Sequence, residues 1–144
     1  KGLRFAKIFK IKKKVFKFKK RSFDEKEILK ILKFERIDLI CLAGFMKILS
    51  KSFIKNFKGK ILNIHPSLLP NYKGLDTHKR VILNKEKYTG CTVHFVSPSL
   101  DAGKIIMQKK IKVKKDDTPK KLAKRVLIEE HKLYPKAILK IFNL

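Results

Sequence analysis

The chain has 144 residues, of which 44% are hydrophobic, and it carries 38 Lys and Arg against 12 Asp and Glu, a formal net charge of +26. This length supports one domain with a hydrophobic core rather than two ordinary domains. No apolar run approaches the roughly 20 residues of a membrane span, and no signal-peptide pattern is visible. We therefore expect a cytoplasmic protein without a membrane partner. The excess charge is mostly lysine rather than the arginine that nucleic-acid recognition favours. We therefore interpret the charge as a solvated surface and expect no nucleic-acid partner; the alternative is that it attracts a polyanion or an anionic substrate.

The first part of the chain contains two predicted helices and a buried strand. Residues 1–10 have near-helical apolar spacing, and residues 15–18 could form a short strand. The capping box SFDE at residues 22–25 begins a second helix, whose apolar face covers residues 28–32. The apolar run DLICLAGF, residues 38–45, predicts a strand that is buried on both faces, as in a parallel sheet.

The rest of the chain alternates helices and strands. We expect helices at residues 50–57, 77–84 and from Thr118-Pro119 to Tyr134, with strands at 61–64, 91–96 and 104–113. This order predicts an α/β fold with a mostly parallel central sheet flanked by helices, in a single domain of residues 1–144. Cys41 and Cys91 lie in apolar strands without metal-ligand spacing, which indicates buried, reduced thiols.

Two polar side chains end an otherwise apolar strand in the stretch LNIHPSLLP, residues 62–70. Asn63 and His65 are two positions apart, so they share one face of the strand, while Leu62 and Ile64 pack on the other. Ligands of open α/β sheets bind beyond the carboxyl ends of the strands, where this pair lies. Asn63 and His65 are therefore candidate site residues; the alternative is that they satisfy buried loop backbone.

Asp101, in the loop SPSLDAG, is the third candidate. A carboxylate near an imidazole favours the protonated ring and orients it. An asparagine amide can donate to an oxyanion, and a histidine can move protons near neutral pH, so Asn, His and Asp together suit acyl transfer. The alternative for Asp101 is a simple turn residue.

The other histidines are weaker candidates. His78, in GLDTH, has no second ligand at zinc spacing, so we expect no metal site. His94 shares a strand face with Thr92 and Val96, which is typical of a core or pocket-lining residue. His131 follows two glutamates on the last helix and is interpreted as solvated or locally paired.

Four stretches of this chain resemble the phosphoribosylglycinamide formyltransferases, the folate-dependent enzymes of purine synthesis. The matching text is LAGFMKILS, GKILNIHPSLLPNYKGLDTHKRVI, GCTVHFVSPSLDAGKIIMQKKI and EEHKLYP, almost continuous over residues 38–135, whereas residues 1–34 match more loosely. The resemblance implies a formyltransferase Rossmann-like fold. It also implies a transferase that moves the formyl group of 10-formyltetrahydrofolate, its co-substrate, to the amine of glycinamide ribonucleotide.

The resemblance also assigns residues. It implies Asn63, His65 and Asp101 as the catalytic set, in agreement with their chemistry. It implies folate contacts at Lys26, at Met46, Lys47, Ile48 and Leu49, at Asn63, and at Ser97, Pro98, Ser99, Leu100 and Asp101. It places ribonucleotide contacts on the last helix, at Leu127, Ile128, Glu129 and Glu130.

The sequence departs from the family pattern in three places. Asp76 stands where the family often has His, and Lys47 where Arg is also common. The family opens with a strand and a glycine- and serine-rich loop that holds the substrate phosphate at a helix start, and this sequence has no counterpart. We therefore expect an N-terminally incomplete domain that lacks this strand and loop; loss of the phosphate site is the alternative.

Three rival functions share some of these features. Methionyl-tRNA formyltransferases have the same catalytic trio and would suit a basic protein, but they carry a C-terminal β-barrel domain. Formyltetrahydrofolate hydrolases use similar motifs, usually behind a regulatory domain. A catalytically inactive, basic nucleic-acid-binding module would need basic residues interleaved with exposed aromatics, which only residues 10–20 offer.

Overall fold

The computed structural model describes residues 2–16 and 21–144, with the side chains of residues 21–24 outside that description. It divides into two units, residues 1–35 and 36–144. The first unit contains α1 (Gly2–Ile8) and α2 (Arg21–Phe34), which confirms the two predicted helices. Residues 15 and 16 have no regular structure, and the remainder of the predicted strand 15–18 lies outside the described residues, as does the Ser22 side chain of the predicted capping box.

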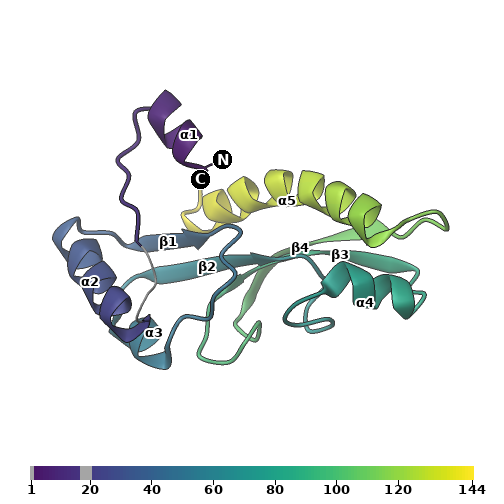
Figure 1. Ribbon diagram of the computed structural model, residues 1–144, viewed down its shortest axis with the longest axis horizontal. Helices are drawn as coiled ribbons and strands as arrows, with labels where there is room; N and C mark the ends of the chain where they lie inside the picture. Colours follow the sequence, from purple (N-terminus) through teal and green to yellow (C-terminus); the bar gives the residue numbers. More distant parts are fainter. Residues whose placement is uncertain (1, 17–20) are drawn as a thin grey trace. The chain divides into compact units, whose positions relative to one another are not determined.

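The second unit is a sheet with helices, which confirms the predicted α/β class (Figure 1). Its strands lie in the order β1-β2-β3-β4. In chain order the elements are β1 (Leu39–Leu42), α3 (Lys51–Asn56), β2 (Lys60–His65), α4 (Thr77–Leu83), β3 (Tyr88–Phe95), β4 (Ile105–Lys112) and α5 (Pro119–Ile141). Side chains cap the starts of α3 and α5: Ser50 accepts from the backbone N–H of Phe53, and Thr118 accepts from that of Lys121.

The strand directions correct part of the prediction. β1 and β2 are parallel, whereas β2–β3 and β3–β4 are antiparallel, so the described sheet is mixed rather than mostly parallel. The connection from β3 to β4, residues 96–104, contains no helix and is shorter than the dozen or so residues that a parallel crossover needs. The strands it joins must therefore run in opposite directions.

β1 is less buried than its apolar sequence predicts. It lies at one edge of the described sheet, and its residues are half-buried except for Cys41, which is exposed. The expectation of a buried thiol is therefore wrong for Cys41. It is confirmed for Cys91 on β3, where burial raises the pKa of the thiol to about 12.

The main core of this unit fills the space between the sheet and two helices. Val81 of α4 packs with Cys91 and Val93 of β3 and with one face of α5, which runs along the sheet (Figure 1). The buried residues of α5 are Leu122, Val126, Leu133 and Ala137. Since side chains alternate along a strand, Thr92 and His94 point to the opposite face of β3, where the polar residues of β2 also lie.

α5 continues beyond its predicted end at Tyr134. Pro135 lies inside the helix, which runs on to Ile141. A proline removes one backbone donor and usually ends or kinks a helix. Here the apolar face continues past the proline with buried Ala137, so packing against the sheet offsets the local cost. Among the described residues, no helix is both long and apolar enough to span a bilayer.

Gly103 gives a test of how tightly the β3–β4 connection is packed. A Cβ at this position would lie 1.7 Å from the carbonyl oxygen of Phe95, so the backbone would have to shift. We expect Gly103→Ala to lower the free energy of unfolding by about 2 kcal/mol or more, measured by thermal and denaturant unfolding.

Gly2→Ala is the matched control, because a Cβ at Gly2 meets nothing within 4 Å in the described structure. Equal stability of the two variants would show that the close approach at Gly103 is not a constraint.

Candidate active site

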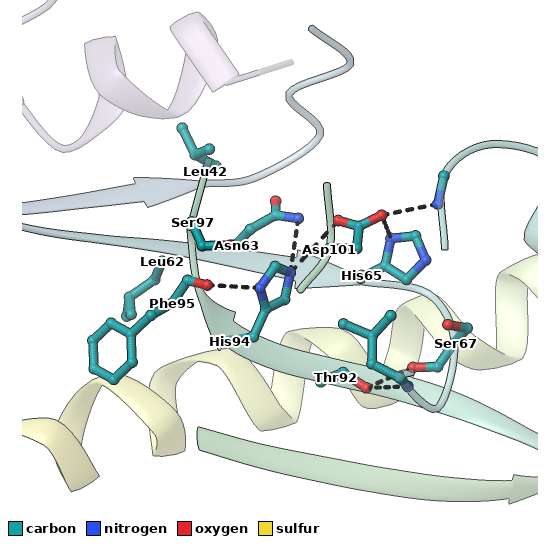
Figure 2. A network of polar contacts seen from close by, with 12 residues as sticks. Leu42, Leu62, Asn63, His65, Ser67, Thr92, His94, Phe95, Ser97 and Asp101 are labelled. Atoms are coloured by element: carbon teal, nitrogen blue, oxygen red, sulfur yellow. Dashed lines mark hydrogen bonds and ion pairs between the residues drawn. The ribbon is translucent and has the colours of Figure 1, made fainter. Parts of the chain in front are cut away.

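The three residues singled out by the sequence converge at one point (Figure 2). Oδ2 of Asp101 lies 3.3 Å from Nδ1 of His65. Oδ1 of the same carboxylate lies 3.7 Å from Nε2 of His94. Nδ2 of Asn63 lies 3.4 Å from that Nε2 atom. His94 therefore connects Asn63 to Asp101, and the four side chains form one polar cluster.

Strand pairing explains how the cluster forms. Asn63 is directly opposite His94 in the antiparallel β2–β3 pair, and His65 is opposite Thr92. Side chains of directly opposed residues lie on the same face of a sheet and close together. The face shared by Asn63 and His65 thus also carries His94, and the loop after β3 brings Asp101 over it.

Asp101 is both a turn residue and a member of the site, so its two sequence interpretations are compatible. Its φ of 46° is in the left-handed region, as for a turn. Its side chain is only 8% exposed, and Oδ2 accepts the backbone N–H of Gly74 at 2.9 Å. The carboxylate therefore joins the loop at residues 71–76 to the loop at residues 97–103, and a buried charge obtains the partners that it requires.

The ring of His65 faces an acceptor on each side. Nε2 lies 2.9 Å from the carbonyl oxygen of Tyr72, which can only accept, so this nitrogen carries the proton and donates. Nδ1 faces the Asp101 carboxylate. The second contact is a hydrogen bond only when Nδ1 also carries a proton. Both nitrogens of the ring therefore face a protein acceptor, which fixes the orientation of the imidazole.

His94 is held in its neutral form. Its Nδ1 donates to the carbonyl oxygen of Phe95 at 2.9 Å, so Nε2 is the acceptor and Asn63 donates to it. Burial lowers the pKa of His94, and the Phe95 carbonyl and Asp101 oppose this shift only in part. A neutral His94 accepts one N–H of the Asn63 amide and so fixes the orientation of that amide. The second N–H of the amide is left for a ligand.

The sequence identified His94 as a core or pocket-lining residue but missed its link to Asn63. The signal that could have found it is the β2–β3 register, because an antiparallel pairing that sets Asn63 opposite His94 places both on one face.

His78 on α4 is a further histidine near His65. Its Nδ1 atom is buried without a hydrogen-bond partner in the described part of the chain. Burial and the charge of His65 lower the pKa of His78.

A cavity of about 630 Å³ opens beside this cluster. Asn63, His65, His94 and Asp101 lie in its wall. The other residues predicted to contact folate in this unit also line it, namely Met46, Lys47, Ile48, Leu49, Ser97, Pro98, Ser99 and Leu100. Lys26 lies on α2 in the first unit. The described residues contain no group of three or more His, Cys, Asp and Glu side chains that could hold a metal ion.

The residues predicted to contact the ribonucleotide are less close to this cavity. Glu130 lines it, and also lines a second cavity of about 290 Å³ between α5 and the end of β1, and burial raises the pKa of its carboxyl. Leu127 and Ile128 are exposed, and Glu129 forms an ion pair of 2.8 Å with Lys132. Of the four, only Glu130 therefore belongs to the cavity walls.

Comparison with known proteins assigns the chain to a family. A model of the formyl transferase family matches residues 1–138. The chain belongs to the formyl transferase family. It is 41% identical to the phosphoribosylglycinamide formyltransferase of Escherichia coli over 118 residues, which are 82% of this chain and 56% of that protein. It is 48% identical to the human trifunctional purine biosynthetic protein adenosine-3 over 117 residues, 81% of this chain and 12% of that protein.

Solved formyltransferases have the same fold as this chain. The crystal structure of phosphoribosylglycinamide formyltransferase from Brucella melitensis superimposes with a TM-score of 0.89 at 45% identity. The superposition covers 97% of this chain and 73% of the other. The formyltransferase fold expected from the sequence is thereby confirmed. The chain spans little more than half of the bacterial relative above and about an eighth of the human protein.

The lowered pKa of His94 predicts a dependence of stability on pH. A histidine whose pKa is lower in the folded than in the unfolded state binds its proton first when unfolded. The stability that neutral His94 contributes is thus present above its ordinary value of 6.5 and is lost as the pH falls through it. The melting temperature should fall between about pH 7.5 and about pH 5.5.

His94→Gln, which keeps an acceptor near the position of Nε2 but cannot titrate, should reduce this fall in melting temperature. The control is His131→Gln on the exposed side of α5, which should leave it unchanged. If His94→Gln has the same pH dependence as the unaltered chain, the burial of a neutral His94 does not contribute.

Proposed function

We propose that this chain forms the catalytic centre of a phosphoribosylglycinamide formyltransferase. It transfers the formyl group from 10-formyltetrahydrofolate to the amine of glycinamide ribonucleotide, a step in the de novo biosynthesis of purines (IMP). The observation that carries the proposal is the convergence of Asn63, His65 and Asp101 in the wall of one cavity. The relatives with the names given above support the same reaction.

The cavity suits the formyl donor in size and composition. Its volume of about 630 Å³ is within the range of roughly 300 to 1,000 Å³ that small-molecule sites occupy. Met46, Ile48 and Leu49 supply an apolar part of its walls, and the loop at residues 97–101 supplies another part. In this proposal the flat, apolar part of the folate lies between these walls, with its formyl group directed at Asn63.

The reaction needs stabilisation of one negative charge and management of one proton. The acceptor amine attacks the formyl carbon, and the carbonyl oxygen takes the negative charge of a tetrahedral intermediate. The bond from that carbon to N10 of the folate then breaks, so the formyl group ends on the acceptor. The proton lost by the attacking amine is taken up by N10 of the departing tetrahydrofolate.

Asn63 and His65 stabilise the developing oxyanion. The Asn63 amide donates the N–H that His94 leaves unused, so its direction is fixed before substrate arrives. A donor that is already oriented need not reorganise in the transition state, which is where such groups act most strongly. In this proposal the ring of His65 lies beside the oxyanion, in the orientation that the Tyr72 carbonyl and the Asp101 carboxylate fix.

Asp101 holds His65 in its productive orientation and shares the proton in transit. Its carboxylate is buried and fixed by Gly74, so it remains beside Nδ1 as the charge develops. In this proposal the Asp101 carboxylate takes up the proton of the attacking amine, and the proton is then delivered to N10 of the departing tetrahydrofolate, while His65 keeps its own protons. The ribonucleotide approaches from α5, where Glu130 lines the cavity wall and residues 127–129 lie nearby in sequence.

Acceptor specificity is the most direct test of this assignment. The chain is incubated with 10-formyltetrahydrofolate and with glycinamide ribonucleotide, methionyl-tRNA or no acceptor, and the release of tetrahydrofolate is followed. Release that requires the ribonucleotide supports the proposal. Release with methionyl-tRNA alone, or without any acceptor, would instead assign the rival transferase or hydrolase function.

Substitution of the three residues should lower turnover far more than folate binding, because these groups act on the transition state. Asp101→Asn and His65→Ala should reduce kcat by about 10² to 10⁴. Asn63→Ala should reduce kcat by roughly 10² to 10³ through loss of the oxyanion donor. The measurements are kcat and the folate Kd of each variant at several pH values.

The control for the charge change is Asp116→Asn, at an exposed carboxylate that pairs with Lys121 outside the cavity. It should keep both constants. Full kcat and an unchanged pH profile in Asp101→Asn would reduce Asp101 to a turn residue and remove it from the mechanism.

A further inference from the structure

A polar row crosses three strands directly behind the catalytic histidine. His65 of β2 is opposite Thr92 of β3, and Thr92 is opposite Gln108 of β4. The three side chains therefore share one face of the sheet. We propose that Thr92 and Gln108 are positioning residues for formyl transfer, which fix the loop that in turn holds the imidazole of His65. This inference rests on the function proposed above.

Thr92 binds the backbone of the segment that follows His65 (Figure 2). Its hydroxyl donates to the carbonyl oxygen of Ser67 at 2.7 Å. The same oxygen atom accepts the backbone N–H of Leu69 at 3.1 Å. Thr92 is fully buried, as is Ser67, so none of these groups can exchange its partner for water.

Gln108 completes the attachment. Its side-chain amide donates to the carbonyl oxygen of Leu69 at 2.8 Å and to the hydroxyl of Thr92 at 2.8 Å. Both backbone polar groups of Leu69 are thus bound to side chains of the sheet. The hydroxyl of Thr92 has its donor and both acceptor sites in use, so its orientation is fully determined.

The restrained segment leads directly to the partner of His65. The Ser67 hydroxyl donates to the carbonyl oxygen of Asn71 at 2.6 Å, and the backbone N–H of Asn71 donates to the carbonyl oxygen of Leu68. The next residue is Tyr72, whose carbonyl accepts the Nε2 proton of His65. Thr92 and Gln108 therefore act on the imidazole through residues 67–72, and they touch neither folate nor the acceptor in this proposal.

The test uses variants that remove single bonds from the row. Thr92→Val keeps the shape but removes the hydroxyl, and Thr92→Ser restores it. Gln108→Met removes the side-chain amide and both hydrogen bonds that it donates. Because Gln108 is exposed, this variant should fold even if Thr92→Val does not. Thr89→Val is the matched control: Thr89 is a buried threonine of the same strand whose hydroxyl has no hydrogen-bond partner in the described residues.

Two readouts separate positioning from general stability. The first is kcat with the folate Kd; the second is the nitrogen and proton NMR signal of the His65 ring, above all its Nε2–H. We expect Thr92→Val and Gln108→Met to lower kcat by about 10- to 100-fold, the size of effect that a small misplacement causes, with little change in folate Kd. The His65 signal should move in both, whereas Thr92→Ser and Thr89→Val should resemble the unaltered chain.

Unchanged His65 signals and unchanged kcat in both Thr92→Val and Gln108→Met would overturn the inference. A loss of kcat that follows the melting temperature and occurs equally in Thr89→Val would also overturn it, since that is a purely structural effect. If the unaltered chain transfers no formyl group, the proposed function fails. The NMR signal then decides the positioning role alone: a shift supports it and an unchanged signal refutes it.

Discussion

The buried carboxylate of Asp101 is the interaction on which the rest of the site depends. A carboxylate that is 8% exposed is stable as an anion only when charged or hydrogen-bonding partners surround it. Those partners are the ring of His65 on β2 and the backbone N–H of Gly74, which come from two separate parts of the chain. The Asp101 carboxylate therefore both orients the ring of His65 and holds the loop at residues 71–76 to the loop at residues 97–103.

Much of this site could be predicted from the sequence because the signals are local. Side-chain alternation placed Asn63 and His65 on one face. The chemistry of a carboxylate near an imidazole made Asp101 a candidate, and the turn role that Asp-Ala-Gly offered as its alternative is compatible with the site. The link through His94 could not be predicted in the same way, because it depends on the register between strands that are distant in sequence. Thr92 and Gln108 were missed for the same reason.

The errors in the predicted fold also have identifiable physical causes. Cys41 belongs to an apolar run, but its strand is at one edge of the described sheet, and an edge position leaves side chains exposed whatever their hydropathy. The last helix was expected to run only to Tyr134, yet buried contacts on both sides of Pro135 keep α5 continuous to Ile141. In both cases tertiary context outweighed a sound local rule.

The large positive charge suits the fold as well as the proposed substrates. β4 lies at the other edge of the described sheet, and its exposed lysines, Lys109, Lys110 and Lys112, disfavour pairing with strands of another molecule. Lys110 also lies 3.9 Å from the ring centroid of Tyr88 on the neighbouring strand, so its side chain covers apolar surface. A net charge of +26 should in addition favour the encounter with anionic folate and ribonucleotide.

The central claim is that Asn63, His65 and Asp101 surround the reacting carbon. It is tested most directly by a crystal structure of the chain with glycinamide ribonucleotide and an unreactive analogue of the formyl donor. The account predicts that the oxygen corresponding to the formyl carbonyl lies about 3 Å from Nδ2 of Asn63, with the ring of His65 next to it. An analogue that binds in the cavity with this oxygen directed away from Asn63 and His65 would contradict the account.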